Sequence, residues 1–117
     1  ETYRGEARAK EQIAKLSGRL GLDLSGLPDL PGLTLRRAQL LGYGDKPLLQ
    51  IAYADAAGRP VALCIIASAS AQRAPARRTL EGLPAVGWAS GEHAFLLIGD
   101  AETDVLDNAA DRVHTSL

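Results

Sequence analysis

Methionine is missing from this sequence, and cysteine, tryptophan and phenylalanine occur once each among its 117 residues. A single cysteine cannot form a disulfide within the chain, which excludes a small domain held together by disulfide bonds. Basic and acidic residues number 13 and 14, so the chain lacks the positive excess of a general nucleic-acid-binding surface. No apolar run approaches the roughly 20 residues that span a bilayer. We therefore expect no direct nucleic-acid partner and no membrane span within this segment.

The composition is that of a folded domain. Apolar residues make up 46% of the chain and the formal net charge is -1, which argues against disorder. The length suits one domain with a single core. Because a complete translation product begins with methionine and this chain begins at Glu1, we expect that residues before Glu1, such as a signal peptide or a membrane anchor, were either processed away or left out.

A helical pattern opens the chain over residues 5–20. Apolar residues recur there at helical spacing and form one stripe: Ala9, Ile13, Leu16 and Leu20. Gly21 follows the stripe and suits a helix end. We expect residues 1–21 to form a lead-in helix and residues 22–117 to form a single α+β domain. The helix either packs on that domain or forms a membrane-proximal stalk.

The segments that flank the central part of the chain differ in character. Residues 22–33 interleave leucines with Pro28 and Pro31, which excludes a regular helix and predicts a turn-rich segment. Near the other end, a second apolar stripe predicts a helix: Val105, Leu106, Ala109, Ala110 and Val113. We expect Thr103 or Asp100 to be its N-cap, and His114 to lie where a cation favours the helix dipole.

Between these helices, alternation of apolar and polar residues predicts strands joined by hairpins. The alternation over 33–40 changes phase at Arg36-Arg37, which predicts a β-bulge. Residues 42–47 (GYGDKP) predict a turn, and a second hairpin is predicted at 57–59 with support from Asp55.

Two segments, 61–67 and 93–98, are apolar on both faces. Such strands need cover on both sides, from helices or from a partner chain. We expect residues 68–77 to form a polar loop or short helix, with further strand at 78–80 and 86–88. The predicted fold is α+β, an antiparallel β-meander sheet of five to six strands with an N-terminal and a C-terminal helix.

One alternative is a small hydrolase that uses Ser90 and His93, which flank one predicted hairpin. A serine hydrolase needs a serine, a histidine and an acid in register, and the sequence has no G-x-S-x-G elbow. The structural interpretation is a turn serine and a solvent-facing or edge histidine. We predict no catalytic residue and no enzymatic activity.

The acidic stretch near the C-terminus has part of the pattern of a calcium-binding loop. Four acids take positions 1, 3, 5 and 12 of a calcium loop: Asp100, Glu102, Asp104 and Asp111. Position 6 needs glycine and holds Val105, whereas acids at a helix N-terminus are favoured by the dipole. Cys64 and two histidines are too few for a zinc site, so Cys64 is expected in the core. We predict no metal and no cofactor.

The candidate interaction surface comprises Trp88 and the basic cluster of Arg73, Arg77 and Arg78. Arginines can contact an anion or a phosphate, but no glycine-rich cradle accompanies these three, and a solvated loop is the structural interpretation. Trp88 suits an interface anchor, or else packing in the core or at its margin.

Several turns and strands of this sequence resemble those of the exported domain of bacterial transmembrane anti-sigma factors. The resemblance lies in residues 50–59 (QIAYADAAGR), in 87–91 (GWASG), in 94–100 (AFLLIGD) with the closing helix, and upstream in 27–33 (LPDLPGL). It covers residues 22–115, and its motifs are signatures of turns and packing.

The resemblance implies a periplasmic domain of an inner-membrane protein that takes part in transcription regulation and stress-response signal transduction. Such a protein holds a sigma factor through a cytosolic segment, which this chain does not contain, and a ligand or periplasmic protease controls release. The resemblance transfers no catalytic residue. The alternative is a secreted dimeric binding module, a homodimer in which an exposed sheet face or edge pairs with a copy of itself.

Overall fold

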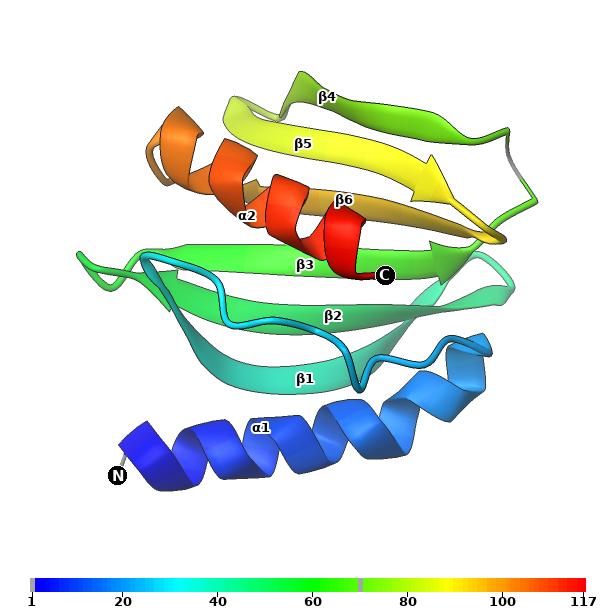
Figure 1. Ribbon diagram of the computed structural model, residues 1–117, viewed down its shortest axis with the longest axis horizontal. Helices are drawn as coiled ribbons and strands as arrows, with labels where there is room; N and C mark the ends of the chain where they lie inside the picture. Colours follow the sequence, from blue (N-terminus) through cyan, green and yellow to red (C-terminus); the bar gives the residue numbers. More distant parts are fainter. Residues whose placement is uncertain (1, 70) are drawn as a thin grey trace.

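The computed structural model describes residues 2–69 and 71–117 and contains two α-helices and a six-stranded sheet (Figure 1). The elements are α1 (Thr2–Ser17), the 3-10 turn η1 (Gly18–Leu20), β1 (Leu33–Tyr43), β2 (Lys46–Asp55), β3 (Pro60–Ala67), β4 (Arg73–Leu80), β5 (Leu83–Ser90), β6 (His93–Gly99) and α2 (Thr103–Ser116). The predicted α+β fold with a helix at each end is confirmed.

All pairings in the sheet are antiparallel, and the strand order is β1-β2-β3-β6-β5-β4. Two three-stranded meanders, β1-β2-β3 and β4-β5-β6, therefore lie side by side and meet where β3 pairs with β6. The two strands apolar on both faces, β3 and β6, are the central pair of the sheet, as their sequences predicted.

The predicted local features of the first meander are present. The register of β1 on β2 shifts between Leu35 and Arg37, which confirms the bulge. The second hairpin closes on Asp55, whose carboxylate oxygen Oδ1 accepts hydrogen bonds from the backbone N–H groups of Ala57 (3.0 Å) and Arg59 (2.8 Å). Gly58 supplies the positive φ of 83° that this turn requires.

One face of the sheet carries the hydrophobic core. Both helices and the segment 21–32 pack on this face, and the segment runs between the two helices (Figure 1). Aligned rows of buried side chains cross the central strands, such as Ile51 on β2, Leu63 on β3 and Leu97 on β6. The core also contains Leu24 and Leu30 of the segment.

The helix ends differ partly from expectation. The 3-10 turn after α1 ends at Gly21, which takes φ 65° and donates its N–H to the Gly18 carbonyl, so the predicted stop is confirmed. The N-cap of α2 is Glu102, without a side-chain cap bond, so the prediction of Thr103 or Asp100 was wrong. Neither helix combines the length and apolar character of a membrane span, among the residues described.

No helix within residues 2–69 and 71–117 packs on the other face of the sheet. We call it the open face. The helices pack on the core face, so helices provide the expected cover of β3 and β6 on one side of the sheet, and cover of the other side from a partner chain stays a prediction. On the open face, Cys64, Ile66, Leu96 and Ile98 are half-buried and aliphatic neighbours flank them. Cys64 was expected in the core and lies here instead, because its position in β3 faces away from Leu63 and Ile65.

Residues 73–77 were expected to be loop or short helix and are strand. They begin β4, the edge strand, which pairs with β5 through a register shift between Arg73 and Ala76. The sequence of this segment is polar because an edge strand buries little of its surface. Pro75 is tolerated there because an edge strand has one side without a neighbouring strand.

Candidate functional site

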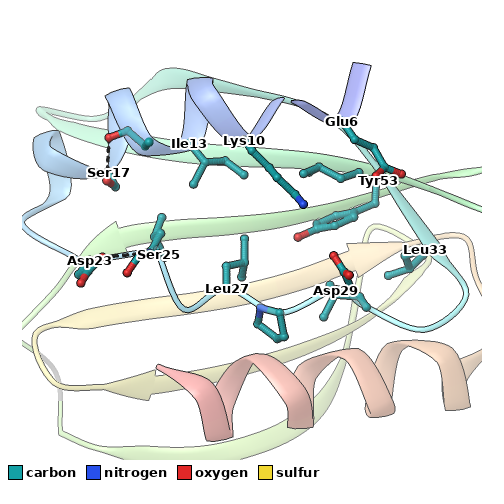
Figure 2. Close-up of a pocket in the computed structure, with 15 residues that line it drawn as sticks. Glu6, Lys10, Ile13, Ser17, Asp23, Ser25, Leu27, Asp29, Leu33 and Tyr53 are labelled. Atoms are coloured by element: carbon teal, nitrogen blue, oxygen red, sulfur yellow. Dashed lines mark hydrogen bonds between the residues drawn. The ribbon is translucent and has the colours of Figure 1, made fainter. Parts of the chain in front are cut away.

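A pocket of about 520 Å³ lies between α1, the segment 21–32 and strands β1 and β2 (Figure 2). Its volume lies within the range of roughly 300–1,000 Å³ that is typical of small-molecule sites. Apolar side chains from all three parts line its walls: Ile13, Leu24, Leu27, Leu30, Leu33 and Leu35.

Helix α1 supplies one wall. Glu6, Lys10, Ile13 and Ser17 line the pocket at spacings of three and four residues, which place them on one helix face. Ile13 is 5% exposed and holds that face on the core, while Lys10 is exposed at the edge of the pocket. The apolar stripe that docks the helix therefore also sets where Lys10 points.

The segment 21–32 supplies the opposite wall. Leu24 and Leu30 are buried and fix it on the core, and two tight turns follow, from Leu27 N–H to the Leu24 carbonyl and from Leu33 N–H to the Leu30 carbonyl. Between these anchors Asp29 is exposed on the pocket rim. The segment thus presents a carboxylate from a backbone held at both ends.

Tyr53 of β2 forms part of the pocket floor. The residue is only 4% exposed, yet its hydroxyl has no hydrogen-bond partner among the described residues, and no fully buried polar side-chain atom there is unsatisfied. The hydroxyl must therefore be open to the pocket. Burial of the ring, and then the negative charge of Asp29, raise the pKa of Tyr53 well above its usual range, so the hydroxyl stays protonated at neutral pH.

Figure 2 shows the side chains of Lys10 and Asp29 directed toward the Tyr53 hydroxyl from opposite walls. No ion pair or hydrogen bond joins these three groups in the part of the chain that the structure describes. Lys10 and Asp29 thus approach the neutral hydroxyl across open space above an apolar floor, and two further acids, Glu6 and Asp23, also line the pocket. This combination can bind and orient a small amphipathic molecule.

Ser90 and His93 do not form a hydrolytic site. They are opposite each other in the β5-β6 hairpin, but His93 is 8% exposed and its Nε2–H donates to the Leu20 carbonyl oxygen at 2.6 Å. The expectation of a solvent-facing or edge histidine was therefore wrong. His93 joins the end of η1 to β6, which is a structural role.

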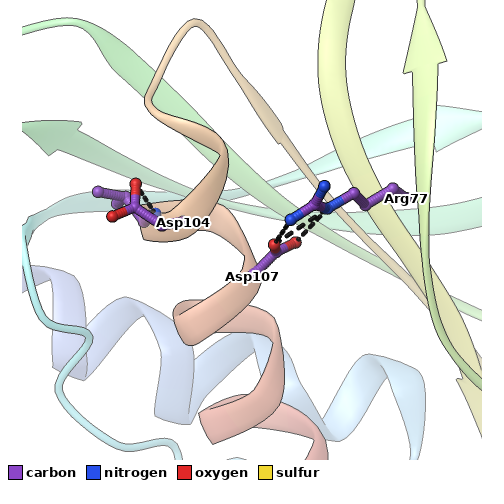
Figure 3. A network of polar contacts seen from close by, with 4 residues as sticks. Arg77, Asp104 and Asp107 are labelled. Atoms are coloured by element: carbon purple, nitrogen blue, oxygen red, sulfur yellow. Dashed lines mark hydrogen bonds and ion pairs between the residues drawn. The ribbon is translucent and has the colours of Figure 1, made fainter.

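The acids near the C-terminus are dispersed. The Asp104 carboxylate accepts a hydrogen bond from the Val105 N–H at 3.0 Å, and Asp107 forms an ion pair with Arg77 (Figure 3). No group of three metal-ligating side chains comes together within residues 2–69 and 71–117. The pairing with Arg77 ties α2 to the edge strand β4 instead.

The candidate interaction surface is divided by the fold. Arg77 lies on the core face beside α2. Arg78 lies on the open face over Gly87, where its Cδ is 3.3 Å from the position that a Cβ added at Gly87 would take. Trp88 is 1% exposed and stacks on Phe95 with ring centroids 5.2 Å apart. It therefore belongs to the core, and the three arginines do not form one patch with it.

The pocket residues were not among the candidates found in the sequence. One signal was available in the sequence. Tyr53 continues the alternation of Leu49 and Ile51 in β2, so its side chain could have been predicted to lie on the core side of the sheet. No protein-family model matches this chain, and no curated protein matches it. What the protein does must therefore be inferred from the pocket, the docked helix and the open face.

Proposed function

We propose that this chain is the extracytoplasmic, periplasmic sensory domain of a membrane-bound anti-sigma factor, which controls release of a sigma factor in stress-responsive transcription. The resemblance of residues 22–115 to that class of domain suggests the assignment. Those residues form the sheet, the segment 21–32 and α2, whereas α1 precedes them as the element leading into the domain.

The observation that carries the proposal is the way α1 is held. The helix rests on the core through one narrow stripe that includes Ala9 and Ile13. Two hydrogen bonds secure it: the Ala38 N–H donates to Gln12 Oε1 at 2.9 Å, and His93 binds the Leu20 carbonyl at the end of η1. Because α1 lies outside the strand pairings of the sheet, it can shift between docked and released states without unfolding the sheet.

The pocket lies under this helix, so its occupancy bears on the same equilibrium. A ligand that contacts both α1 and the sheet binds the docked state more tightly than the released state, and shifts the population toward docking. The segment before the domain would lead toward the membrane. Release of α1 would make that segment accessible to a protease or a partner. The sigma factor itself would bind a cytosolic segment outside residues 1–117, and no residue of this domain acts as a catalyst.

The complete gene provides the test. We expect its product to carry an apolar spanning helix upstream of Glu1 and, expressed in a bacterial host, to retain a sigma factor during purification. Deleting the part that encodes residues 22–117 should keep sigma-factor binding and abolish regulated release. A start codon directly before Glu1, or full-length protein that retains no sigma factor, would refute the proposal.

The open face favours a second candidate, a secreted binding module that dimerises through that face. Half-buried aliphatic side chains such as Ile66 and Leu96 lie there with no helix over them, and sheets commonly pack face to face on a copy. Sedimentation should then give a dimer that Leu96→Lys converts to a folded monomer, whereas Ala7→Lys, at an exposed position of α1 away from the open face, should not. A monomer at high concentration excludes this candidate.

A further inference from the structure

We infer that the pocket between α1 and the segment 21–32 binds a free amino acid with a large apolar side chain. The charged and polar groups that converge there match the two ends of a zwitterion. Lys10 presents a cation, Asp29 presents an anion, and the neutral Tyr53 hydroxyl lies between them (Figure 2).

The pairing of each group follows from charge. The α-carboxylate of the ligand accepts hydrogen bonds from the Lys10 ammonium and from the Tyr53 hydroxyl, and its α-ammonium donates to the Asp29 carboxylate. These partners are not already used, since no hydrogen bond or ion pair joins Lys10, Tyr53 and Asp29 among the described residues. A buried tyrosine usually has a partner for its hydroxyl, and the ligand would supply the one that this chain lacks.

The pocket walls select the rest of the ligand. Below the charged rim the lining is aliphatic, with leucines from the segment 21–32 and from β1 facing Ile13 of α1. A volume of about 520 Å³ accommodates a side chain as large as that of phenylalanine together with its charged head. The acids Glu6, Asp23 and Asp29 repel a molecule that carries only a negative charge, and Lys10 has no partner on a molecule that carries only a positive charge.

Binding of the amino acid by this domain does not depend on the proposed function. Its role as the signal that keeps α1 docked rests on the proposed function. The two claims fail separately. Calorimetric titration of residues 1–117 tests ligand binding, and retention of a sigma factor by the full-length product tests the regulatory role.

Four probes that differ in one feature each define the ligand. We expect phenylalanine to bind at least tenfold more tightly than phenylalaninamide, which lacks the anion, and than 3-phenylpropionate, which lacks the cation. Glycine, which lacks the apolar group, should give no detectable heat. A preference for either singly charged analogue, or no binding of phenylalanine at millimolar concentration, would overturn the inference.

Three variants test the contacts. Tyr53→Phe, Lys10→Gln and Asp29→Asn should each weaken phenylalanine binding by about tenfold. Lys15→Gln and Asp45→Asn change the same charges outside the pocket and should leave the affinity unchanged. Thermal unfolding by circular dichroism identifies any variant that has not folded, and Tyr53→Phe, which keeps the ring, is the variant best placed to remain folded. Unchanged affinity in all three folded pocket variants would contradict the site.

Discussion

Tyr53 has a ring that belongs to the core and a hydroxyl that belongs to the pocket. The ring is stabilised by burial, whereas the hydroxyl makes no hydrogen bond within the described chain. Removing it should therefore cost little, because no protein group loses a partner. We expect Tyr53→Phe to change the free energy of unfolding in urea by no more than about 0.5 kcal/mol. A loss well above 1 kcal/mol would show that the hydroxyl has a structural partner.

The raised pKa of Tyr53 has a signed consequence for stability at high pH. Below the unfolded-state pKa of about 10, the hydroxyl is protonated in both states and does not change the balance. As the pH rises above 10, the unfolded chain ionises while the folded one does not, so stability falls. The loss should be smaller in Tyr53→Phe than in the wild type, as followed by thermal unfolding between neutral and alkaline pH.

The pKa of Asp55 is shifted in the opposite direction from that of Tyr53. Its pKa is lowered chiefly by the hydrogen bond that its carboxylate accepts from the Arg59 N–H, although partial burial opposes the shift. A lowered pKa adds stability above the unfolded value of 3.8, and this stability is lost as the pH falls through the folded value. We expect Asp55→Asn to lower the melting temperature at neutral pH, with the difference from the wild type narrowing below about pH 4. Asp45→Asn, in the turn of the first hairpin, is the matched control and should show neither effect.

Single residues were predicted well where their role is local. The bulge at Arg36-Arg37, the carboxylate of Asp55 and the stop at Gly21 all depend on neighbours within a few positions, and all three are confirmed. His93 and Cys64 were placed wrongly because their surroundings come from distant elements. The partner of His93 is the carbonyl of Leu20, 73 positions away.

At the scale of elements, β6 ends where its backbone lies very close to β3. A Cβ added at Gly99 would lie 2.6 Å from the Pro60 carbonyl oxygen and 2.8 Å from the Val61 Cα. Because these are backbone atoms, the strands would have to move apart. We expect Gly99→Ala to lower the free energy of unfolding by about 1–3 kcal/mol. Gly42→Ala, which meets no atom within 4 Å and has no positive φ, is the control and should stay close to the wild type.

The attachment of α1 to the sheet can be tested through His93. Replacing it by alanine leaves the Leu20 carbonyl without its partner, at a cost of about 1–3 kcal/mol, and should loosen the end of the helix. The bond after Arg19, an exposed residue, should then be cut faster by trypsin under native conditions. Ser90→Ala, opposite His93 in the same hairpin, should not accelerate cleavage. Equal cleavage of both variants and the wild type would show that His93 does not hold α1.

The elements that sequence patterns predicted best are those with two clear signals. Both helices and β2 have an apolar period and β3 is a continuous apolar run, and all four have glycine or turn residues at their ends. Residues 78–80 of β4 were predicted as strand, but residues 73–77 were not, because this edge strand buries almost none of its side chains and so has no apolar period. The N-cap of α2 was displaced by one or two residues because Glu102 takes the extended backbone that Thr103 or Asp100 was expected to take.

At the scale of the whole molecule, the sheet has one covered face and one open face. The open face holds Cys64, whose thiol pKa is raised by burial. We expect its reaction with a thiol reagent to be slower than that of the urea-unfolded chain at the same pH. If two copies pack through this face, the rate should fall further as protein concentration rises, and Leu96→Lys should abolish that dependence. A rate equal to that of the unfolded chain would contradict the burial.

The pocket could not have been predicted as a unit from the sequence. Lys10, Asp29 and Tyr53 come from a helix, an irregular segment and a strand, and no spacing along the chain relates them. They are brought together by the docking of α1 and by the path of the segment 21–32 over the core, both of which are tertiary features. The fold class, by contrast, follows from local periodicity, which is why it was predicted correctly.

The position of α1 along β1 also bears on how the molecule avoids polymerising. The opposite edge, β4, is interrupted by Pro75 and carries three arginines, which discourage the addition of further strands. The β1 edge has no such interruption from proline, and one of its N–H groups, that of Ala38, is occupied by Gln12 of the helix. A molecule whose helix has left would present an 11-residue strand as a template for another chain, so we expect the docked helix to protect this edge from strand addition.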